Sequence, residues 1–358
     1  MSAVEVRILG ELDPSEGLGP FWEAIVKENP ASGIMQSLHW ARMKRLQGLD
    51  AIHFGVFEDN QLIGGALYYT GQRLNGTGIM VAPEGPVLPW SESDRTCLHL
   101  RLLKDAAQEY ACRHGIISMR IEPRLVPPSP NYLREFVRAP ANLVPRETLY
   151  VDLRPDQDAL LASMKPKGRY NIKLAKRHGV EIEEHKTIDA VRDFYAALVE
   201  ASQRDIFALE SRGFFERLAS TLCPAGLASI LLAKHEGELL GALLLIVYGE
   251  RATYLYGGVT NTKRNLMGGY ALQWQAMQKA RAAGCTTYDF YGYVPHRSPE
   301  HEYARFSQFK SQFGGQPMRF TGAQDYFFLD NFAEAFVKVA AEIKNVASEK
   351  GEKQPAII

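Results

Sequence analysis

The sequence predicts an α+β protein in which sheets and helices pack in layers and one structural unit is used twice. Two observations support this prediction: a repeated turn-and-strand pattern, and a repeated helix that ends in glycine and leads into a short strand. A mixed sheet crossed by a long helix is the arrangement that this order of elements favours. The length of 358 residues also favours two domains over one.

The repeated turn-and-strand pattern is a polar turn followed by an apolar run that contains glycine. Residues 58–69 read EDNQLIGGALYY, and residues 235–245 read HEGELLGALLL. This pattern is typical of a β-hairpin that leads into a buried strand.

The repeated helix is predicted in AAQEYACRHG, which ends at Gly115, and in AMQKARAAG, which ends at Gly284. Glycine adopts the left-handed conformation that terminates many helices. Short strands are predicted next, in IISMRIEP and CTTYDFYGY. Because both copies run hairpin, helix and strand, we infer a duplication, with domains at 1–148 and 149–320. One more amphipathic helix, AEAFVKVAAEIKNVASEK, is expected within 321–358, packed back on the body of the protein.

Composition excludes several classes of protein. The 41 basic and 41 acidic residues give a formal net charge of +0, so a polyanion must be held at a local patch and general DNA binding is not expected. The first residues do not form a signal peptide, and the longest apolar run, LLGALLLIVY at 239–248, is too short to span a bilayer. A cytoplasmic protein is therefore predicted. The cysteines show no zinc-ligand spacing, so no metal site is expected; they are Cys97, Cys112, Cys223 and Cys285.

One segment gathers positive charge in this neutral chain. Residues 165–178, KPKGRYNIKLAKRH, hold six Lys or Arg and no acid. Pro166 suits the first turn of a helix and Gly179 its end, and Arg169, Lys173 and Lys176 would then form one stripe. A solvated helix face is one interpretation. Lysines at the positive end of the helix dipole, with no acidic partners, favour a phosphate site instead.

Two further segments carry candidate site residues. In ARFSQFKSQFGG, Lys310 lies among Phe306, Phe309 and Phe313, which recur at helical spacing. Such a stripe is usually core, but a lysine held in it is a fixed cation suited to neutralising an oxyanion. In ATYLYGGV, Tyr254 and Tyr256 alternate onto one face of a predicted strand, where core and pocket lining are equally open.

Taken together, these segments resemble the FemABX-type aminoacyltransferases of peptidoglycan bridge synthesis. The matching pieces of the second copy are MKPKGRYNIKLAKRHGVEI, YLYGGVTNTKRNLMGGYALQWQAMQKARAAGCTTYDFYGY and RFSQFKSQFGG. Those of the first copy are MQSLHWARMK, APEGPV and MRIEP. The resemblance extends from about residue 35 to 320. It implies two tandem GNAT-like (acyl-CoA N-acyltransferase-like) domains. It also implies transfer of an amino acid from aminoacyl-tRNA to the stem-peptide amine of a UDP- or lipid-linked muropeptide, in cell-wall synthesis.

The resemblance also implies roles for single residues. Lys310 would be catalytic and would stabilise the tetrahedral intermediate. The other positions would contact substrate, the charged ones near the precursor and its pyrophosphate and the aromatic ones in the pocket lining. They are Lys44, Glu122, Arg169, Lys173, Tyr254, Tyr256 and Phe309. No metal, no cofactor and no Ser-His-Asp or Cys-His nucleophile is implied, and a peripheral contact with the inner face of the membrane is compatible with a lipid-linked acceptor.

Other functions stay open at this point. An acyl-CoA N-acyltransferase would share the fold, but KRNLMGGYAL has Asn265 and Tyr270 where the pyrophosphate-binding loop has Gln or Arg and Gly or Ala. A FemAB-like protein could also serve an exopolysaccharide or another amine acceptor. A non-catalytic RNA-binding protein is disfavoured by the neutral charge and by the lack of a recognised RNA module. The sequence leaves open which amino acid is donated.

Overall fold

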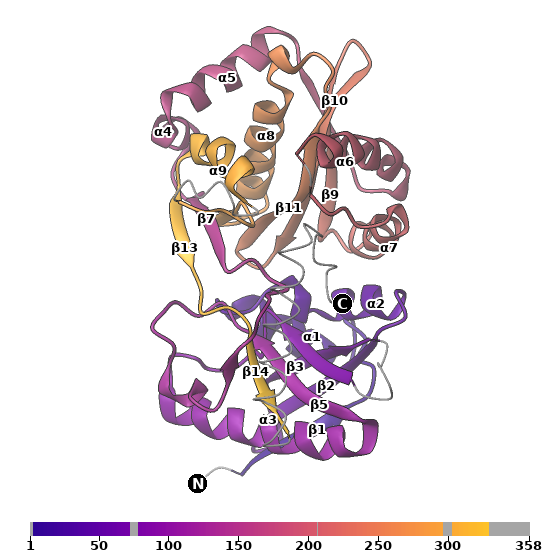
Figure 1. Ribbon diagram of the computed structural model, residues 1–358, viewed down its shortest axis with the longest axis vertical. Helices are drawn as coiled ribbons and strands as arrows, with labels where there is room; N and C mark the ends of the chain where they lie inside the picture. The colour runs from indigo at the N-terminus through magenta and orange to yellow at the C-terminus, as the bar shows by residue number, and fades with distance from the viewer. Residues whose placement is uncertain (1–2, 72–77, 206, 296–302, 329–358) are drawn as a thin grey trace, which may run out of the picture. The chain divides into compact units, whose positions relative to one another are not determined.

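The chain forms two units, each with a sheet of its own. A computed structural model describes residues 3–71, 78–205, 207–295 and 303–328 (Figure 1). The first unit holds the chain up to Arg146 and the chain from Phe320 on, and the second holds Glu147–Arg319. The residues directly after the second unit thus return to the first. The C-terminal helix expected in AEAFVKVAAEIKNVASEK lies outside the described residues.

The first unit is built on a seven-stranded sheet of order β1-β2-β3-β4-β5-β14-β6. β4 and β5 are parallel, and the other neighbouring pairs are antiparallel. β14, drawn in yellow in Figure 1, comes from the returning segment and pairs with β5. The strands are β1 (Val4–Leu9), β2 (Asp50–Glu58), β3 (Gln61–Thr70), β4 (Gly78–Pro83), β5 (Ile116–Glu122), β6 (Val137–Arg138) and β14 (Gln324–Phe327).

The helices of the first unit pack on this sheet. The long helix α3 connects the parallel strands β4 and β5, and its apolar side joins the core of the unit. α1, α2 and the short 3-10 helix η1 lie between β1 and β2 in the chain and contribute buried residues such as Trp22 and Trp40. The bounds are α1 (Gly19–Glu28), η1 (Ile34–Gln36), α2 (Leu38–Arg45), α3 (Ser93–His114) and η2 (Asn131–Leu133).

The second unit repeats this plan with a sheet of order β13-β7-β12-β11-β10-β9-β8. Here β11 and β12 are the parallel pair, and β7 is the antiparallel neighbour of β12. The strands are β7 (Glu147–Asp152), β8 (Glu181–His185), β9 (Ala228–His235), β10 (Glu238–Tyr248), β11 (Arg251–Val259), β12 (Thr287–Asp289) and β13 (Gln316–Arg319).

The helices of the second unit cover both faces of its sheet. α8 connects the parallel strands, and its buried residues join a core with the inner residues of α4 and α5. α6 packs on β10 and β11 from the other face, where glycine at position 258 lets it approach closely. The helices are α4 (Gln157–Ser163), α5 (Pro166–Arg177), η3 (Ile188–Ala190), α6 (Val191–Asp205), α7 (Arg212–Leu222), η4 (Arg264–Leu266), α8 (Gly268–Ala282), α9 (Ala304–Lys310) and η5 (Ser311–Phe313).

The predicted duplication is confirmed by the order of elements. Four antiparallel strands, a helix and a parallel strand follow one another in both units, as β1 to β4, α3 and β5, and as β8 to β11, α8 and β12. Both hairpin turns have positive φ at two successive residues, Asp59–Asn60 and Glu236–Gly237, as the tight hairpin requires. Both helices are followed by a left-handed glycine, with φ of 64° at Gly115 and 84° at Gly284. The sequence therefore predicted these local features correctly.

Among the described residues, no helix has the length and apolar character needed to cross a membrane.

Candidate active site

Lys310 ends α9, and its side chain is buried. Its Nζ donates hydrogen bonds to the carbonyl oxygens of Phe290, Tyr291 and Gly292, at 2.9, 2.9 and 2.6 Å. These residues directly follow β12, and Tyr291 has a φ of 48°, which is unusual for a residue with a bulky side chain. An ammonium group has three N–H donors, so this geometry uses all of them and ties α9 to the end of β12.

Lys310 is held away from bulk water. Burial lowers the pKa of Lys310 to about 7, and the nearby carboxylate of Asp289 opposes this shift. That carboxylate is itself buried and accepts hydrogen bonds from Thr148 Oγ1 at 2.5 Å and from the Tyr291 amide at 2.9 Å. A cation so placed acts on nearby charge far more strongly than it would in water.

Aromatic rings line the same region. The Lys310 Nζ lies 5.5 Å from the centroid of the Tyr254 ring, which packs edge-on against Phe290. Phe309 packs against Tyr270 of α8, with ring centroids 5.1 Å apart. The structure therefore brings together three of the predicted site residues, Lys310, Tyr254 and Phe309.

Tyr256 does not join this group, although the sequence places it on the same strand face as Tyr254. A β-bulge between the partners of Tyr254 and Tyr256 shifts the register of β11 by one residue. Tyr256 consequently packs against Phe214 and Phe215 of α7, with ring centroids 6.0 and 5.0 Å apart. The expectation that the two tyrosines share one face is wrong, because an extra residue in a strand reverses the alternation.

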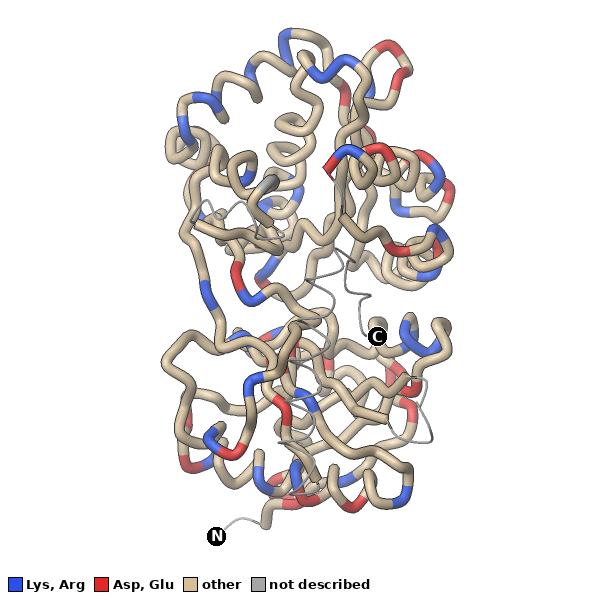
Figure 2. The backbone as a smooth tube through the Cα atoms, in the orientation of Figure 1, with Lys and Arg blue, Asp and Glu red and all other residues tan. Residues whose placement is uncertain are grey.

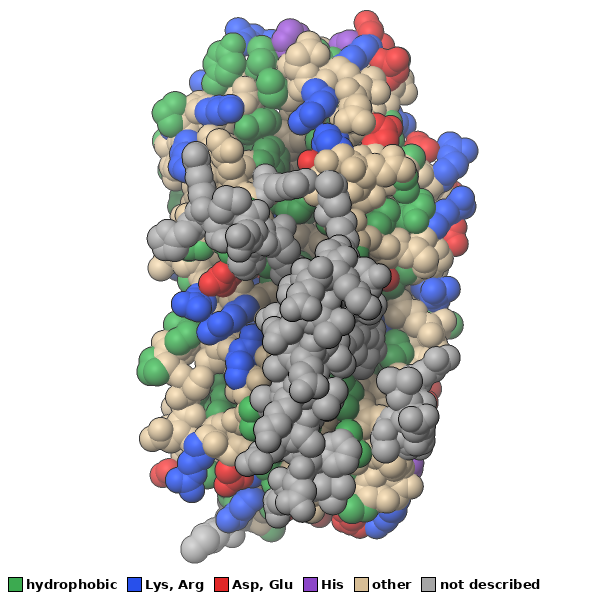
Figure 3. Space-filling view, viewed as in Figure 1, with side chains coloured by type: hydrophobic (Ala, Val, Ile, Leu, Met, Phe, Trp, Pro, Cys, Tyr) green, Lys and Arg blue, Asp and Glu red, His purple; other side chains and the backbone are tan. Residues whose placement is uncertain are grey.

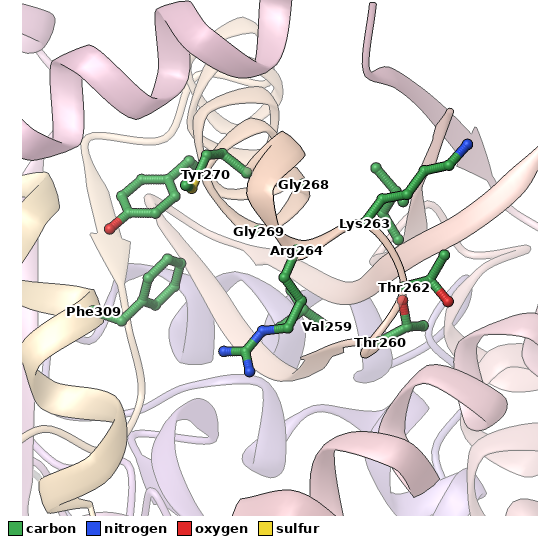
Figure 4. Close-up of a pocket in the computed structure, with 11 residues that line it drawn as sticks. Val259, Thr260, Thr262, Lys263, Arg264, Gly268, Gly269, Tyr270 and Phe309 are labelled. Carbon is green, nitrogen blue, oxygen red and sulfur yellow. The ribbon is translucent and has the colours of Figure 1, made fainter. Parts of the chain in front are cut away.

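A pocket of about 150 Å³ lies at the N-terminus of α8. Figure 4 shows Tyr270 and Phe309 on one side of it and Thr260 and Thr262 on the other. No side chain caps α8, so the positive end of its dipole faces an opening. The pocket also reaches Phe309, the residue that directly precedes Lys310 in the chain.

Two cations border this pocket and differ in their environment. Lys263 binds the carboxylates of Glu236 at 2.9 Å and Glu238 at 2.7 Å, and in Figure 4 its ammonium group points away from Phe309. Arg264 is exposed and forms no ion pair within the described residues. Glycine at position 269 keeps the entrance open, since a Cβ there would lie 3.0 Å from Val259 and 3.6 Å from Phe309. The arrangement suits an anionic group held by helix amides and a guanidinium.

The basic segment forms α5, as predicted, but its cations differ in environment. Arg169 Nη1 donates to the carbonyl oxygens of Ala162, at 3.2 Å, and of Met164, so it closes the C-terminal end of α4. Lys173 is exposed. On the buried side of α5, Asn171 lies close enough to the Tyr270 side chain to lower its pKa, against the rise caused by burial, so the helix lies against the pocket wall.

The first unit holds the two remaining predicted residues, Lys44 and Glu122. Lys44 lies in the last turn of α2, with its Nζ 5.8 Å from the Trp40 ring. Glu122 ends β5 and is 3% exposed, and its carboxylate accepts hydrogen bonds from the amides of Leu143 and Val144. Burial raises the pKa of Glu122 to about 7, although these amides and Arg120 lower it. The carboxylate therefore holds the 143–144 segment in place.

Comparison with known proteins follows the same division of the chain. The FemAB family matches residues 22–129, and the acetyltransferase (GNAT) domain matches residues 165–305. The chain is 22% identical to the Lipid II:glycine glycyltransferases of Staphylococcus saprophyticus and Staphylococcus aureus (strain MRSA252), over 85% of this chain and 90% of each relative. The crystal structure of FemX aligns with a TM-score of 0.81 at 21% identity, covering 93% of this chain and 99% of that one. The predicted resemblance to the FemABX family is confirmed.

The FemAB-like chain also shares its fold with a tandem GNAT protein from the clavulanic acid biosynthesis pathway. The TM-score is 0.55 at 13% identity, and the alignment covers 91% of this chain and 99% of that one. The predicted fold of two tandem GNAT-like domains is thus confirmed. Lys310 and Phe309 lie beyond the stretch that matches the GNAT domain, which ends at residue 305.

The FemAB-like motifs of the first unit meet in a buried polar cluster. Glu84 of APEGPV is paired with Arg124 at 3.2 Å and accepts a hydrogen bond from the amide of Met35. The Gln36 side chain bonds the backbone of Leu67 in both directions, at 2.8 and 3.1 Å. These motifs therefore build the interior of the first unit, an arrangement that short sequence matches do not show.

Two residues that line the second-unit pocket, and one that lies beside its wall, were not predicted as site residues from the sequence. Arg264 and Tyr270 lie in KRNLMGGYAL, which was considered only as an acyl-CoA loop, and Asn171 was read as part of a basic helix. A usable signal was present, since two adjacent glycines at 268–269, shortly after Arg264 and directly before a helical pattern, are typical of an anion-binding helix start.

Proposed function

We propose that this FemAB-like chain is an aminoacyltransferase that moves an amino acid from aminoacyl-tRNA to the stem-peptide amine of a lipid-linked peptidoglycan precursor. The observation that carries the proposal is the similarity to proteins named Lipid II:glycine glycyltransferase along 85% of this chain and 90% of each relative. The FemABX resemblance supplies the class of donor. A lipid-linked acceptor would bring the protein to the membrane surface as a peripheral partner.

The reaction needs little chemistry from the protein. The acceptor nitrogen attacks the acyl carbon of the ester, and the carbonyl oxygen becomes an oxyanion. The oxyanion then re-forms the carbonyl group and the ribose oxygen of the tRNA leaves with the electron pair of the broken C–O bond. The proton lost by the amine converts this oxygen to a hydroxyl group. Alignment of the two substrates and stabilisation of the oxyanion account for most of the rate gain in such a reaction.

Lys310 is the proposed source of positive charge for the oxyanion. Its three N–H groups are all bonded to carbonyl oxygens, so one of these bonds must be exchanged when the donor is bound. The bond to the Tyr291 carbonyl is the candidate, because it is partly exposed whereas the other two are buried. Exchange of one acceptor for another of higher negative charge would strengthen the interaction as the oxyanion forms.

The α8 pocket is the proposed site for the phosphorylated end of the donor. Helix amides without a side-chain cap and the exposed guanidinium of Arg264 suit a phosphate group. Phe309 and Tyr270 offer apolar surface beside the phosphate group, and Phe309 directly precedes Lys310 in the chain. Tyr254 would line the part of the site that holds the acyl group of the donor.

For the acceptor we propose Lys44 as a contact of the precursor pyrophosphate. Glu122 would affect acceptor binding indirectly, because it holds the 143–144 segment in place. Tyr256 would affect it only through the packing of β11 on α7. Arg169 would support α5 from the carbonyl groups of α4 and offer its remaining N–H groups to phosphate.

An acyl-CoA donor is the second candidate, because the pocket at the start of α8 is also suited to a pyrophosphate. The test is to incubate the purified protein with lipid II and a pool of charged tRNAs, with UDP-muropeptide and acetyl-CoA in parallel reactions, and to read the products by mass spectrometry. We expect lipid II to gain the mass of one amino acid only when charged tRNA is present. No mass gain with any charged tRNA would refute the proposal, and an acyl gain from acetyl-CoA would support the second candidate.

A further inference from the structure

The exposed face of α5 concentrates cations that no acid neutralises. Lys167, Lys173, Lys176 and Arg177 are all exposed, and within the described parts of the chain none of them forms an ion pair. Tyr170 lies among them with 57% of its surface exposed, and the Arg177 guanidinium is 5.9 Å from its ring. Figure 2 shows Lys and Arg along α5 with no Asp or Glu among them.

Several exposed cations on other helices of the second unit are balanced by acids. Arg192 of α6 binds Asp193 at 3.1 Å, and Arg212 of α7 binds Glu216 at 2.8 Å. In the space-filling view, the surface over α5 at the upper left shows Lys and Arg without Asp or Glu (Figure 3). The excess positive charge is therefore a property of this helix and not of the whole unit.

The opposite face of α5 is fixed to the elements that form the candidate active site. A Cβ on Gly168 would lie 2.3 Å from the carbonyl oxygen of Gln312 in η5, so the helix touches the segment directly after Lys310. Asn171 lies beside the Tyr270 side chain, which lines the α8 pocket. The exposed cations thus belong to a rigid element that contacts both the pocket wall and the segment that carries Lys310.

We propose that the exposed face of α5 is a docking surface for the sugar-phosphate backbone of RNA. The inference rests on the proposed function, because the RNA would be that of the aminoacyl-tRNA donor. From Lys167 to Arg177 the helix rises about 15 Å, enough to contact several phosphates. Lys173, expected from the sequence to contact substrate, then contacts the donor RNA. The exposed Tyr170 adds a ring on which an unpaired base can stack.

An anionic membrane surface fits this face less well. A helix that lies in the interface presents a broad apolar face to the lipid. Here the apolar side of α5 is buried in the protein, with Ile172 and Ala175 at 7% and 0% exposure, and Tyr170 is its one exposed aromatic side chain. The charge without apolar surface favours a polyanion in water.

The test compares two triple variants of the full chain. Lys173→Gln/Lys176→Gln/Arg177→Gln removes three cations of α5. Lys186→Gln/Arg192→Gln/Arg212→Gln removes three exposed cations elsewhere in the second unit and changes the net charge equally. Binding of fluorescein-labelled unacylated tRNA is measured by anisotropy between 0.05 and 0.3 M KCl (an assay range of about sixfold in salt), with thermal melts to confirm folding.

We expect the α5 variant to bind tRNA about 25- to 60-fold more weakly at 0.1 M salt, since each phosphate contact contributes about 0.7 to 0.9 to the slope of log K against log salt and two lost contacts suffice. The control variant should bind within about twofold of the wild type. Equal tRNA affinity of the folded α5 variant and the wild type would overturn the proposal. So would an α5 variant that keeps tRNA binding but no longer sediments with phosphatidylglycerol vesicles, since the face would then bind membrane.

These outcomes are separate from the test of the proposed function. If the wild type transfers an amino acid from charged tRNA and the α5 variant binds tRNA normally, the docking surface is wrong while the proposed function stands. If the wild type transfers no amino acid with any charged tRNA, the proposed function fails by itself, and the docking proposal that rests on it fails with it.

Discussion

The role of Lys310 can be tested by substitution with methionine, which keeps an unbranched stem of similar size and removes the ammonium group with its charge and donors. If the ammonium stabilises the oxyanion, Lys310→Met should lower the single-turnover rate by a factor on the order of 10² to 10³, the usual loss for one such donor. The affinity for both substrates should change little, because the interaction strengthens only in the transition state. The assay is single-turnover transfer from pre-charged tRNA to lipid II.

The structure also predicts that Lys310→Met lowers the stability of the protein, and this effect must be measured separately from the loss of rate. Lys310 is the donor to three carbonyl oxygens, two of them in buried bonds. An unsatisfied buried acceptor costs about 1–3 kcal/mol, so Lys310→Met should also lower the free energy of unfolding by several kcal/mol. Urea unfolding measures this cost, and the rate assay is run well below the midpoint of unfolding.

The pH dependence of the transfer rate distinguishes a catalytic role of Lys310 from a purely structural one. Burial lowers the pKa of Lys310 to about 7, so the ammonium form is complete below that pH and is lost as the pH rises through it. The wild-type rate should then fall about tenfold per pH unit above 7, whereas Lys310→Met should show no such fall. A folded variant with a near wild-type rate, or with the same pH profile as the wild type, would refute the catalytic role.

Three further sets of substitutions test the structural assignments. Burial raises the pKa of Glu122 from 4.5 to about 7. The protonated carboxyl therefore contributes about 3 kcal/mol to stability below pH 4.5, and this contribution is lost as the pH rises to 7. Urea melts at several pH values should show this change for the wild type and not for Glu122→Gln. Arg120→Leu and Asp325→Leu should each cost about 3–5 kcal/mol, because each leaves a buried charge unpaired, while the double variant should cost less than their sum. Gly168→Ala should destabilise by about 1–3 kcal/mol, since its Cβ meets a carbonyl oxygen at 2.3 Å. Gly213→Ala, whose Cβ would make only an ordinary contact of 3.4 Å with the Arg217 side chain, should stabilise by about 0.5–1 kcal/mol, and equal effects of the two would contradict the close approach of α5.

The sequence predicted those features that depend on neighbouring residues. Hairpin turns need positive φ, and the pairs that mark the turns in the two copies are Asp59–Asn60 and Glu236–Gly237. Likewise Gly115 and Gly284 mark the ends of α3 and α8. Because these signals recur in the same order, the duplication and the fold class followed without any knowledge of long-range contacts.

Features that depend on distant contacts were not predictable. The bulge in β11 that separates Tyr254 from Tyr256 has no signature in the strand itself, since it arises from pairing with β10. The bonds of Arg169 to the end of α4 and of Lys310 to the residues after β12 also depend on how separate segments pack. The sequence identified Lys310 and Arg169 as unusual cations but not the carbonyl groups that bind them.

The return of the chain to the first sheet has a consequence for synthesis on the ribosome. The second unit is one continuous stretch, so it can fold as soon as Arg319 has emerged. The first unit must wait for β14, whose Asp325 binds Arg120 of β5 through two hydrogen bonds of 2.7 and 2.9 Å. Until then β5, buried along nearly its whole length in the finished protein, is an open sheet edge. During that interval the nascent chain must be kept from pairing through this edge, and a chaperone that shields extended apolar segments would act between the emergence of Glu122 and that of Phe327.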